Sequence, residues 1–284
     1  MTDPANRNRE ITAVVACFNY GRFLEEAVES LLSQNGGPPN VIVVDDGSTD
    51  EATIAVLDSL PPELEVIRQP NQGVSAARNT GLMRASTPLV LALDADDRLA
   101  RGALEAMRAG LDENPTAGFA YGHQRFFGAM NGVMKLPPYD PYKLLHRHLI
   151  GPTALTRQAV IADTGGYDTS FEYYEDWEFW MNALAHGWRG VRVDAITHEY
   201  RRRAGSKLAR DRSRYRASRR QMKAKHAALF RQQRGLARAA GVPAREQLIY
   251  RAFWGPRPVP PMVEAWLYRR LWPSRPARSR TTER

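Results

Sequence analysis

The stretch LVLALDADDRL, from Leu89 to Leu99, holds three carboxylates, at Asp94, Asp96 and Asp97. Its apolar run Leu89 to Leu93 is short and continuous, which predicts a strand buried on both faces. Like charges this close resist joint ionisation, so a bound cation is the simplest way to keep all three ionised. Oxygen ligands favour a hard ion, Mg²⁺ or Mn²⁺, and Mg²⁺ is commonly held by carboxylates together with substrate phosphates. The stretch therefore predicts a metal-bridged phosphate ligand.

A second interpretation of this stretch is purely structural and requires no bound ligand. Aspartate is a common N-cap, because its carboxylate accepts hydrogen bonds from the first N–H groups of a helix. Asp97 would then cap a helix that begins near Leu99. The segment DDGSTD, Asp45 to Asp50, leaves the same choice open. Its carboxylates could hold a nucleobase or ribose hydroxyls, or Ser48 or Asp50 could cap the next helix.

Predicted strands and helices alternate along the first hundred residues, and these elements must position the acidic residues. Apolar runs predict strands, and apolar residues three or four apart predict helices. The predicted strands are 11–17, 41–44, 65–68 and 89–93, and the predicted helices are 21–34, 52–60 and 75–83. This order predicts an α/β fold with a mostly parallel sheet flanked by helices. Polar residues follow three strands, at Asn19, Asp45 and Asp94, and we expect them to share one crevice at the strand ends.

Length and composition limit the number of domains, the cellular compartment and the membrane topology that can be expected. The 284 residues are enough for one large domain or for one domain with an appendage. Cys17 is the only cysteine, so no intrachain disulfide forms and a reducing compartment is expected. No stretch approaches the roughly 20 apolar residues of a membrane-spanning helix, and the first ten residues lack the apolar core of a secretory signal. We therefore expect a cytoplasmic protein.

The net charge of +9 conceals an uneven distribution. From Arg201 to Arg284 there are 24 Lys and Arg against four Asp and Glu, so the tail is strongly basic and the preceding body is acidic. This asymmetry predicts two units, 1–203 and 204–284, with different partners. An apolar residue recurs every seven positions from Leu208 to Leu236, but the companion positions are polar. That pattern favours a basic helix with one apolar stripe over a coiled coil.

The last part of the tail, from Phe253 to Trp272, interleaves aromatic residues with arginine. Such a mixture suits a membrane interface, so we expect peripheral contact with an anionic membrane at its inner face. A helical hairpin packed on the body, with its arginines in solvent, is the alternative. Nucleic acid is not the expected partner, because no recognition motif accompanies the basic residues.

Five motifs, in order, resemble glycosyltransferases of family 2, which have the GT-A fold. They are ACFNY at 16–20, VIVVDDGSTD at 41–50, NQGVSAARNTGL at 71–82, LALDADD at 91–97, and GGYDTSF at 165–171 with EDWE at 175–178. The resemblance spans about Thr12 to Tyr200. It implies a GT-A (Rossmann-like) catalytic domain in 1–203, followed by a basic helical extension. It also implies inverting transfer of a sugar, most simply from a UDP-sugar, to a glycan, lipid-linked or small-molecule hydroxyl, assisted by Mn²⁺ or Mg²⁺.

The resemblance further implies a role for each residue that matches the family's motifs. Asp176 would be the general base, and Asp96 would bind the metal, with Asp94 and Asp97 as candidate further ligands. Contacts to the nucleotide sugar would come from Ala16, Phe18, Asn19, Asp45, Asp46, Arg78, Asp94, Ala95 and Asp96. Contacts to the acceptor would come from Gly166, Glu175 and Trp177.

Helical spacing helps to separate the acids around the base. Residues one and two apart on a helix point to different faces, so only one of Glu175, Asp176 and Glu178 can face the sugar squarely. Glu178 then fits a surface position. Trp177 also fits core packing, because it shares a helical face with Trp180.

One position departs from the family. Many relatives continue with a pattern like YRxHxxS, whose histidine completes the metal site, and here Arg203 stands at that position. His198 is a candidate substitute. Arg201 to Arg203 could instead neutralise a diphosphate directly, because guanidinium groups pair with phosphate oxygens.

Two rival functions belong to other classes. A nucleotidylyltransferase on a similar sheet would have a glycine-rich loop with Arg and Lys after the first strand, and Ala16 to Gly21 lacks one. A nucleic-acid-binding protein would use the basic tail and keep the body as a scaffold.

Overall fold

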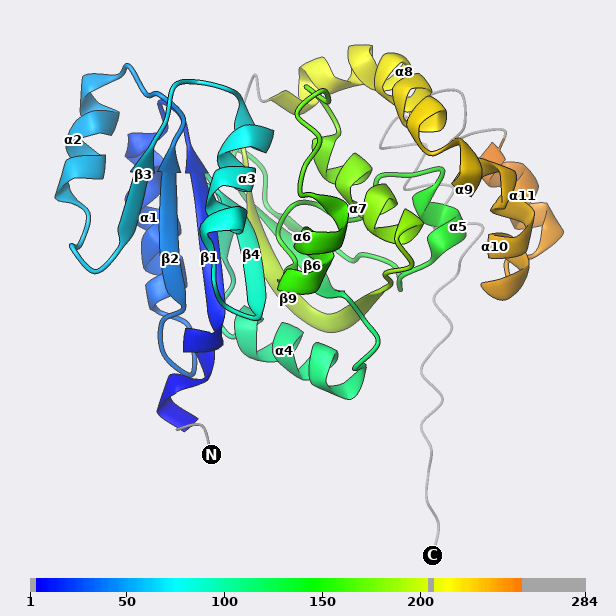
Figure 1. Cartoon of the computed structure of the whole chain (residues 1–284), viewed down its shortest axis with the longest axis horizontal. Helices are drawn as coiled ribbons and strands as arrows, with labels where there is room; N and C mark the ends of the chain where they lie inside the picture. Colours follow the sequence, from blue (N-terminus) through cyan, green and yellow to red (C-terminus); the bar gives the residue numbers. More distant parts are fainter. Residues whose placement is uncertain (1–3, 204–206, 252–284) are drawn as a thin grey trace, which may run out of the picture.

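The computed structural model describes residues 4–203 and 207–251 (Figure 1). The strands are β1 Ile11–Cys17, β2 Asn40–Asp45, β3 Glu65–Arg68, β4 Leu89–Asp94, β5 Arg98–Leu99, β6 Phe119–Gly128, β7 Gly132–Met134, β8 Leu155–Arg157 and β9 Gly190–Arg202. The helices of the body are η1 Pro4–Glu10, α1 Gly21–Leu32, α2 Glu51–Ser59, α3 Val74–Arg84, α4 Ala103–Glu113, α5 Pro141–Leu144, α6 Gln158–Thr164 and α7 Glu175–Ala185. The tail contributes α8 Lys207–Lys225, α9 Ala227–Arg231, α10 Gln233–Ala239 and α11 Ala244–Ile249.

The strands form one sheet in the order β3-β2-β1-β4-β8-β6-β9-β5, with β7 paired to β6. The four strands expected to be parallel are parallel, with Ala16 opposite Asp94 and Cys17 opposite Asp45. This register brings the polar ends of three strands to one edge, as the strand order predicts. The second half is mixed: β8 runs antiparallel to β4 and β6, whereas β6 and β9 are parallel. The α/β sheet with flanking helices is therefore confirmed.

Two hydrophobic cores lie on opposite faces of the sheet, because successive strand residues point to opposite sides. Ala13 and Val15 of β1 pack with α1 and α4, and Val14 between them packs with α3, α6 and α7. Gly81 of α3 allows the close approach of this helix to β1, since an added Cβ would lie 2.3 Å from a methyl carbon of Val14. The sheet is thus buried on both faces, which explains the continuous apolar runs of its strands.

Helices α8 and α9 of the tail pack against the body beside α7, and α10 and α11 lie beside α5 (Figure 1). Tyr215, Met222 and Leu229 of the seven-residue repeat are buried in the same core cluster as Trp177. Glu178, expected at the surface, is 0% exposed, and its Oε1 lies 2.8 Å from both Lys225 Nζ and His226 Nε2. That expectation is wrong because the tail covers this face of α7. The aromatic stretch from Phe253 to Trp272 lies outside the described residues.

Within the described ranges, none of the helices has the combination of length and apolar sequence that crossing a bilayer requires.

Candidate active site

Asp94, Asp96 and Asp97 lie at the carboxyl end of β4, where the Asp97 N–H donates to the carbonyl oxygen of Asp94 and forms a tight turn. The side chains of Asp94 and Asp96 are 29% and 21% exposed, whereas that of Asp97 is 1% exposed. Asp97 is followed by β5, and the next helix begins only at Ala103, so the interpretation of Asp97 as a helix cap is wrong. Two of the three carboxylates therefore face solvent.

Asp97 and His198 form a buried pair. Asp97 Oδ2 lies 2.8 Å from His198 Nε2, and Asp97 Oδ1 accepts the Arg201 N–H at 2.8 Å. His198 Nδ1 is 3.4 Å from the side-chain amide of Gln124. In this arrangement the two side chains face each other in the interior. The metal-ligand roles expected for Asp97 and His198 remain predictions, which this buried pairing does not favour.

Asp96 is paired with Arg203, whose Nη2 lies 2.6 Å from Asp96 Oδ2 and 2.6 Å from the Tyr20 hydroxyl. Burial, together with the carboxylates of Asp97 and Asp94, raises the pKa of Asp96 to about 6, against the opposing charge of Arg203. Neighbouring carboxylates that disfavour each other's ionisation in this way are chemically suited to a cation.

Among the residues that the structure describes, no group of three or more His, Cys, Asp or Glu side chains is arranged to hold a metal ion. The partly exposed carboxylates at the end of β4 are thus those of Asp94 and Asp96. These fit an ion such as Mg²⁺ whose other ligands are phosphate oxygens and water.

Arg78 of α3 connects the end of β4 to the start of α7. Its Nη2 lies 2.5 Å from Asp94 Oδ1 and its Nη1 lies 3.1 Å from Glu175 Oε1. The guanidinium also stacks over the Tyr167 ring at 5.1 Å, and the residue is 2% exposed. Burial would lower the pKa of Arg78, but Asp94, Tyr167 and Glu175 raise it above its usual value, so the side chain stays charged. Arg78 and Glu175 are therefore held to each other beneath the site.

Asp176 lies in the first turn of α7, and both of its carboxylate oxygens are engaged. Oδ1 accepts the Trp177 N–H at 2.8 Å, and Oδ2 lies 2.8 Å from His148 Nε2. Burial would raise the pKa of Asp176, but His148, Arg78 and the Trp177 N–H together lower it below its usual value. The carboxylate is therefore ionised at neutral pH and can accept a proton. Sequence reasoning missed His148, because it lies in a loop far from Asp176 in the chain and belongs to no motif.

Two residues expected to contact the acceptor are buried instead. Trp177 is 1% exposed, and its indole N–H donates to the carbonyl oxygen of Leu144 at 2.7 Å. Gly166 has a φ of +84°, and an added Cβ would lie 2.4 Å from Asn79 Oδ1. Asn79 in turn holds Tyr167 through two hydrogen bonds of 2.7 Å. Trp177 and Gly166 thus occupy packing positions, and their direct contact with an acceptor remains a prediction.

Hydrogen bonds connect the DDGSTD segment to the loop between β3 and α3. The Asp46 carboxylate accepts hydrogen bonds from the Gln69 side chain and from the N–H groups of Gln72 and Gly73. Asp50 caps α2 by accepting the Thr53 N–H, so the capping interpretation is correct for this residue. Asp45 and Asp46 are 4% and 3% exposed. Their contact with a nucleotide remains a prediction.

The end of β1 lies beside the end of β4. Phe18 is 43% exposed, and Ala16 is half-buried beside Asp94. Asn19 has a φ of +55°, and its Oδ1 accepts the N–H groups of Thr49 and Asp50. Ala95, in contrast, is 3% exposed and packs in the core. A strained non-glycine residue such as Asn19 is often found in a functional loop.

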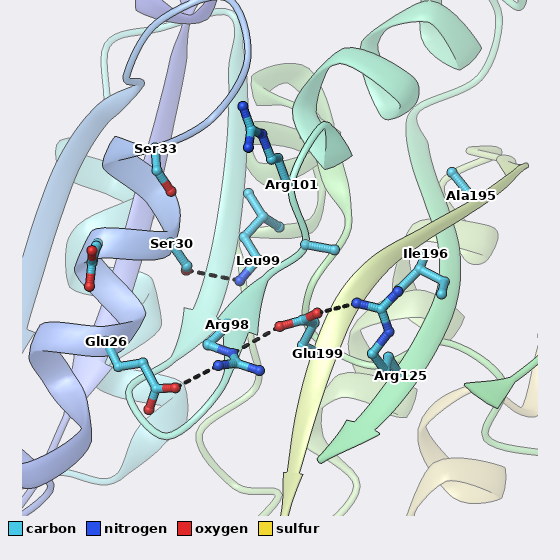
Figure 2. A pocket seen from close by; sticks show the side chains of 12 residues that line it. Glu26, Ser30, Ser33, Arg98, Leu99, Arg101, Arg125, Ala195, Ile196 and Glu199 are labelled. Carbon is cyan, nitrogen blue, oxygen red and sulfur yellow. Dashed lines mark hydrogen bonds and ion pairs between the residues drawn. The ribbon is translucent and has the colours of Figure 1, made fainter. Parts of the chain in front are cut away.

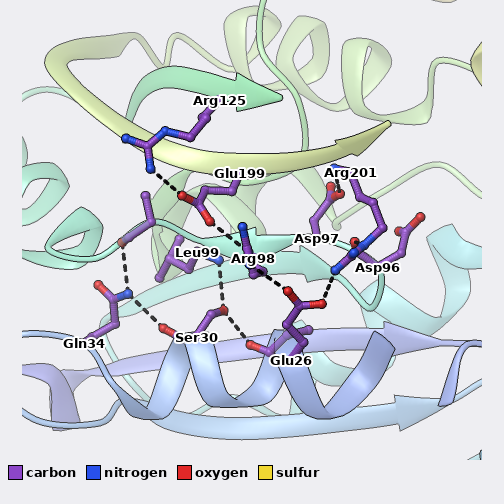
Figure 3. A network of polar contacts seen from close by, with 12 residues as sticks. Glu26, Ser30, Gln34, Asp96, Asp97, Arg98, Leu99, Arg125, Glu199 and Arg201 are labelled. Atoms are coloured by element: carbon purple, nitrogen blue, oxygen red, sulfur yellow. Dashed lines mark hydrogen bonds and ion pairs between the residues drawn. The ribbon is translucent and has the colours of Figure 1, made fainter. Parts of the chain in front are cut away.

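A polar network fixes the segment that follows the three aspartates (Figure 3). Arg201 bonds to Glu26 and donates from Nε to the carbonyl oxygen of Asp96 at 2.7 Å. Arg98 lies 2.7 Å from Glu26 and 2.8 Å from Glu199. These contacts join α1 to β9 and hold the backbone around Asp96 in place.

A hollow of about 750 Å³ lies beside this network, between α1 and β9 (Figure 2). Its charged lining includes Glu26, Arg98, Arg125 and Glu199, which pair with one another. None of the residues expected at the site lines this hollow. The polar side chains at the ends of β1, β2 and β4 are therefore the better candidate for the active site.

In α/β sheets with parallel strands, ligands bind at the carboxyl ends of those strands, where Asp45, Asp46, Asp94 and Asp96 lie here. Residues 12–164, more than half of the chain, match the model of glycosyl transferase family 2. The chain belongs to this family.

Two relatives align with this chain over more residues than the family model does. An uncharacterised glycosyltransferase of Mycobacterium bovis is 29% identical over 69% of this chain and 88% of its own length. A UDP-Gal:alpha-D-GlcNAc-diphosphoundecaprenol beta-1,3-galactosyltransferase of Escherichia coli is 26% identical over 66% of this chain and 74% of its own length. The protein is therefore a glycosyltransferase by family.

Two solved structures show the same fold. S. aureus TarS, crystallised with UDP, aligns with a TM-score of 0.58 and 23% identity over 68% of this chain and 60% of its own. The mannosyltransferase PcManGT from Pyrobaculum calidifontis, in complex with GDP-Man and Mn²⁺, has a TM-score of 0.60 and 19% identity over 95% of this chain and 82% of its own. Both are GT-A glycosyltransferases, so the expected fold is confirmed.

Proposed function

We propose that the protein transfers a sugar from a nucleoside-diphosphate sugar to a hydroxyl acceptor, with inversion at the anomeric carbon. The observation that carries this proposal is the bridge by Arg78 between Asp94 and Glu175. This bridge supports the proposal because it connects the end of β4 to the first turn of α7, which carries the candidate base. The family assignment supports transferase activity and lends no support to a nucleotidylyltransferase or a nucleic-acid-binding scaffold.

The donor would lie over the strand ends. Phe18 and Asn19 form the exposed rim, while Asp45, Asp46 and Arg78 shape the floor beneath the nucleotide. Asp96, together with Asp94, would hold Mn²⁺ or Mg²⁺, which supplies Lewis-acid stabilisation of the negative charge on a departing diphosphate. Arg203 lies at Asp96 and carries a guanidinium that would neutralise phosphate oxygens as well.

Asp176 would act as the general base. An acceptor hydroxyl loses its proton to the carboxylate, and the freed oxygen forms a bond to the anomeric carbon. The bond from that carbon to the diphosphate oxygen breaks at the same time, and its electron pair leaves with the diphosphate. Single displacement from the opposite face inverts the configuration, and a carboxylate ionised at neutral pH meets the requirement for a base.

The donor is proposed to be a UDP-sugar. TarS structures contain UDP or UDP-GlcNAc, and the name of the E. coli relative specifies UDP-Gal. PcManGT holds GDP-Man, so the fold accepts more than one base. A glycan or lipid-linked hydroxyl is the proposed acceptor, in keeping with the diphosphoundecaprenol substrate named for the E. coli relative.

A basic face of the tail supports peripheral contact with an anionic membrane. The exposed cations of α8 whose side chains the structure describes include Arg214, Arg216, Arg220 and Lys223. From 214 to 251 the only acidic residue is Glu246, which is 9% exposed. Clustered cations without neighbouring exposed acids are attracted to anionic lipid.

The proposed activity is tested by incubating the full chain with UDP-, GDP- and dTDP-sugars and Mn²⁺. Release of the nucleoside diphosphate, transfer to added acceptors and thermal shift are measured together. We expect one donor class to stabilise the protein and to release its nucleoside diphosphate. If no donor binds, is hydrolysed or is transferred, the proposal is wrong.

A further inference from the structure

His148 lies in the loop between α5 and β8, and its Nε2 is 2.8 Å from Asp176 Oδ2. The same nitrogen is 3.0 Å from the carbonyl oxygen of Ile150. Because an ionised carboxylate and a carbonyl can only accept, Nε2 must carry the hydrogen. This assigns the neutral tautomer and leaves Nδ1 as the ring nitrogen whose protonation changes with pH.

The imidazole ring is held by aromatic side chains as well as by hydrogen bonds. It stacks on Trp177 with centroids 6.2 Å apart and an interplanar angle of 19°. It meets the edge of Tyr174 at 5.9 Å and 84°. Trp177 is itself fixed by its bond to Leu144. The side chain of His148 is 34% exposed, so protons from solvent reach the ring even though its position is fixed.

We propose that His148 is a positioning residue, which aligns the Asp176 carboxylate for the acceptor hydroxyl and sets how strongly that carboxylate takes its proton. The proposal deepens the proposed function and rests on it. Trp177 N–H and His148 Nε2 each engage one oxygen of Asp176, and each oxygen keeps a further lone pair for the acceptor. The proton from the acceptor goes to Asp176, as in the transfer step above, and His148 itself takes none.

The charge of His148 controls the basicity of Asp176. An imidazolium beside the carboxylate stabilises its ionised form and makes it a weaker base, whereas a neutral imidazole leaves it a stronger one. Among the described residues, the charged groups that act on the pair are Glu175 on α7 and Arg78 on α3. The neighbouring tyrosines are Tyr167, near Asp176, and Tyr174, whose ring meets His148. Burial would lower the pKa of His148, but Asp176 and Glu175 raise it above its usual value. Turnover should therefore increase with pH as His148 loses its proton above about pH 6.5.

Three variants separate orientation from charge. His148→Gln keeps an N–H donor for Asp176 but cannot titrate, so turnover should stay within about tenfold of the wild type and lose the rise above about pH 6.5 that the imidazole causes. His148→Phe keeps the ring without the donor, and turnover should fall roughly 100-fold, as a misplaced catalytic group would cause. His186→Gln changes an exposed histidine next to the end of α7 and should leave the profile unchanged.

A second readout does not depend on the reaction. The protein has six histidines, and the imidazole NMR signal that His148→Gln removes belongs to His148. Its pKa should lie above 6.5 in the wild type and fall in Asp176→Asn, which removes the neighbouring negative charge. The proposal is overturned if the signal titrates at the same pH in both proteins, or if His148→Gln keeps the pH profile of the wild type. Absence of transfer by every protein, with the NMR shift still present, would count against the proposed function and not against the pairing.

Discussion

Arg78 lies 2.5 Å from Asp94, and this contact joins the carboxylates at the end of β4 to the helix that carries the candidate base. The guanidinium reaches Glu175 on its other side, so one buried cation lies between Asp94 and Glu175. A single side chain from α3 thereby couples two motifs that are far apart in the sequence.

Replacing Arg78 with Met should be strongly destabilising. The substitution leaves Asp94 and Glu175 without their buried cation, and loss of one partner from a buried ion pair costs about 3 to 5 kcal/mol. Arg84→Met is the matched control, because Arg84 lies on the same helix and pairs with Glu65 at the surface. That control should cost less than about 1 kcal/mol. Urea unfolding of both variants measures the free energies of unfolding. Equal losses would show that the Arg78 bridge stabilises the protein no more than the surface ion pair of Arg84.

Asp176→Asn should leave donor binding intact and reduce transfer. An amide has nearly the shape of a carboxylate but cannot take the acceptor's proton, so turnover should fall roughly 10²- to 10⁴-fold. Donor affinity and turnover are to be measured side by side with Glu175→Gln. Near-normal turnover of Asp176→Asn, combined with an inactive Glu175→Gln, would move the base to Glu175.

Gly166→Ala should destabilise the protein more than Gly165→Ala. Both glycines have a positive φ, so each alanine costs about 1 to 2 kcal/mol of backbone strain. An added Cβ meets open space at Gly165 but lies 2.4 Å from Asn79 Oδ1 at Gly166, which adds about 1 to 3 kcal/mol for overpacking. Thermal unfolding of the two variants gives the comparison. A larger loss in Gly165→Ala would contradict the close packing of Gly166 on α3.

Binding to anionic vesicles should depend on the basic face of the tail. The double variant Arg216→Gln/Arg220→Gln removes two cations worth about 1 kcal/mol each near a membrane surface, so partitioning should fall roughly tenfold or more. Removal of Phe253 to Arg284 should weaken binding as well, and high salt should release the wild type. Arg84→Gln/Arg101→Gln is the control on the body. Equal binding to neutral and anionic vesicles, or none to either, would exclude membrane contact by this face.

The first half of the fold could be predicted from the sequence because its elements are locally encoded. The run from Ile11 to Cys17 is apolar throughout, and the helix after it shows a clear helical repeat. The second half could not be predicted in the same way. β8 has three residues, and β6 pairs with β9, which lies far from it in the sequence. No local pattern encodes either feature.

The candidate site shows the same division. Asp94, Asp96 and Asp97 look alike in sequence, and only the turn after β4 sends Asp97 inward to His198. The place of Asp176 follows from the family motif, but its contact with His148 requires the folded chain. Motifs thus located the acids, and tertiary packing decided which of them face solvent.

Donor affinity with and without Mn²⁺ is the most direct test of the proposed site, because it asks whether the carboxylates of β4 hold a metal-bound nucleotide sugar. Calorimetric titration of UDP-GlcNAc, UDP-Gal and GDP-Man into the wild type should show one donor whose affinity rises about tenfold or more with Mn²⁺. In Asp96→Asn that gain should disappear, while Asp58→Asn, an exposed aspartate on α2, should behave like the wild type. Donor binding that ignores Mn²⁺ in the wild type, or a gain that survives in Asp96→Asn, would contradict a metal-bound donor at the end of β4.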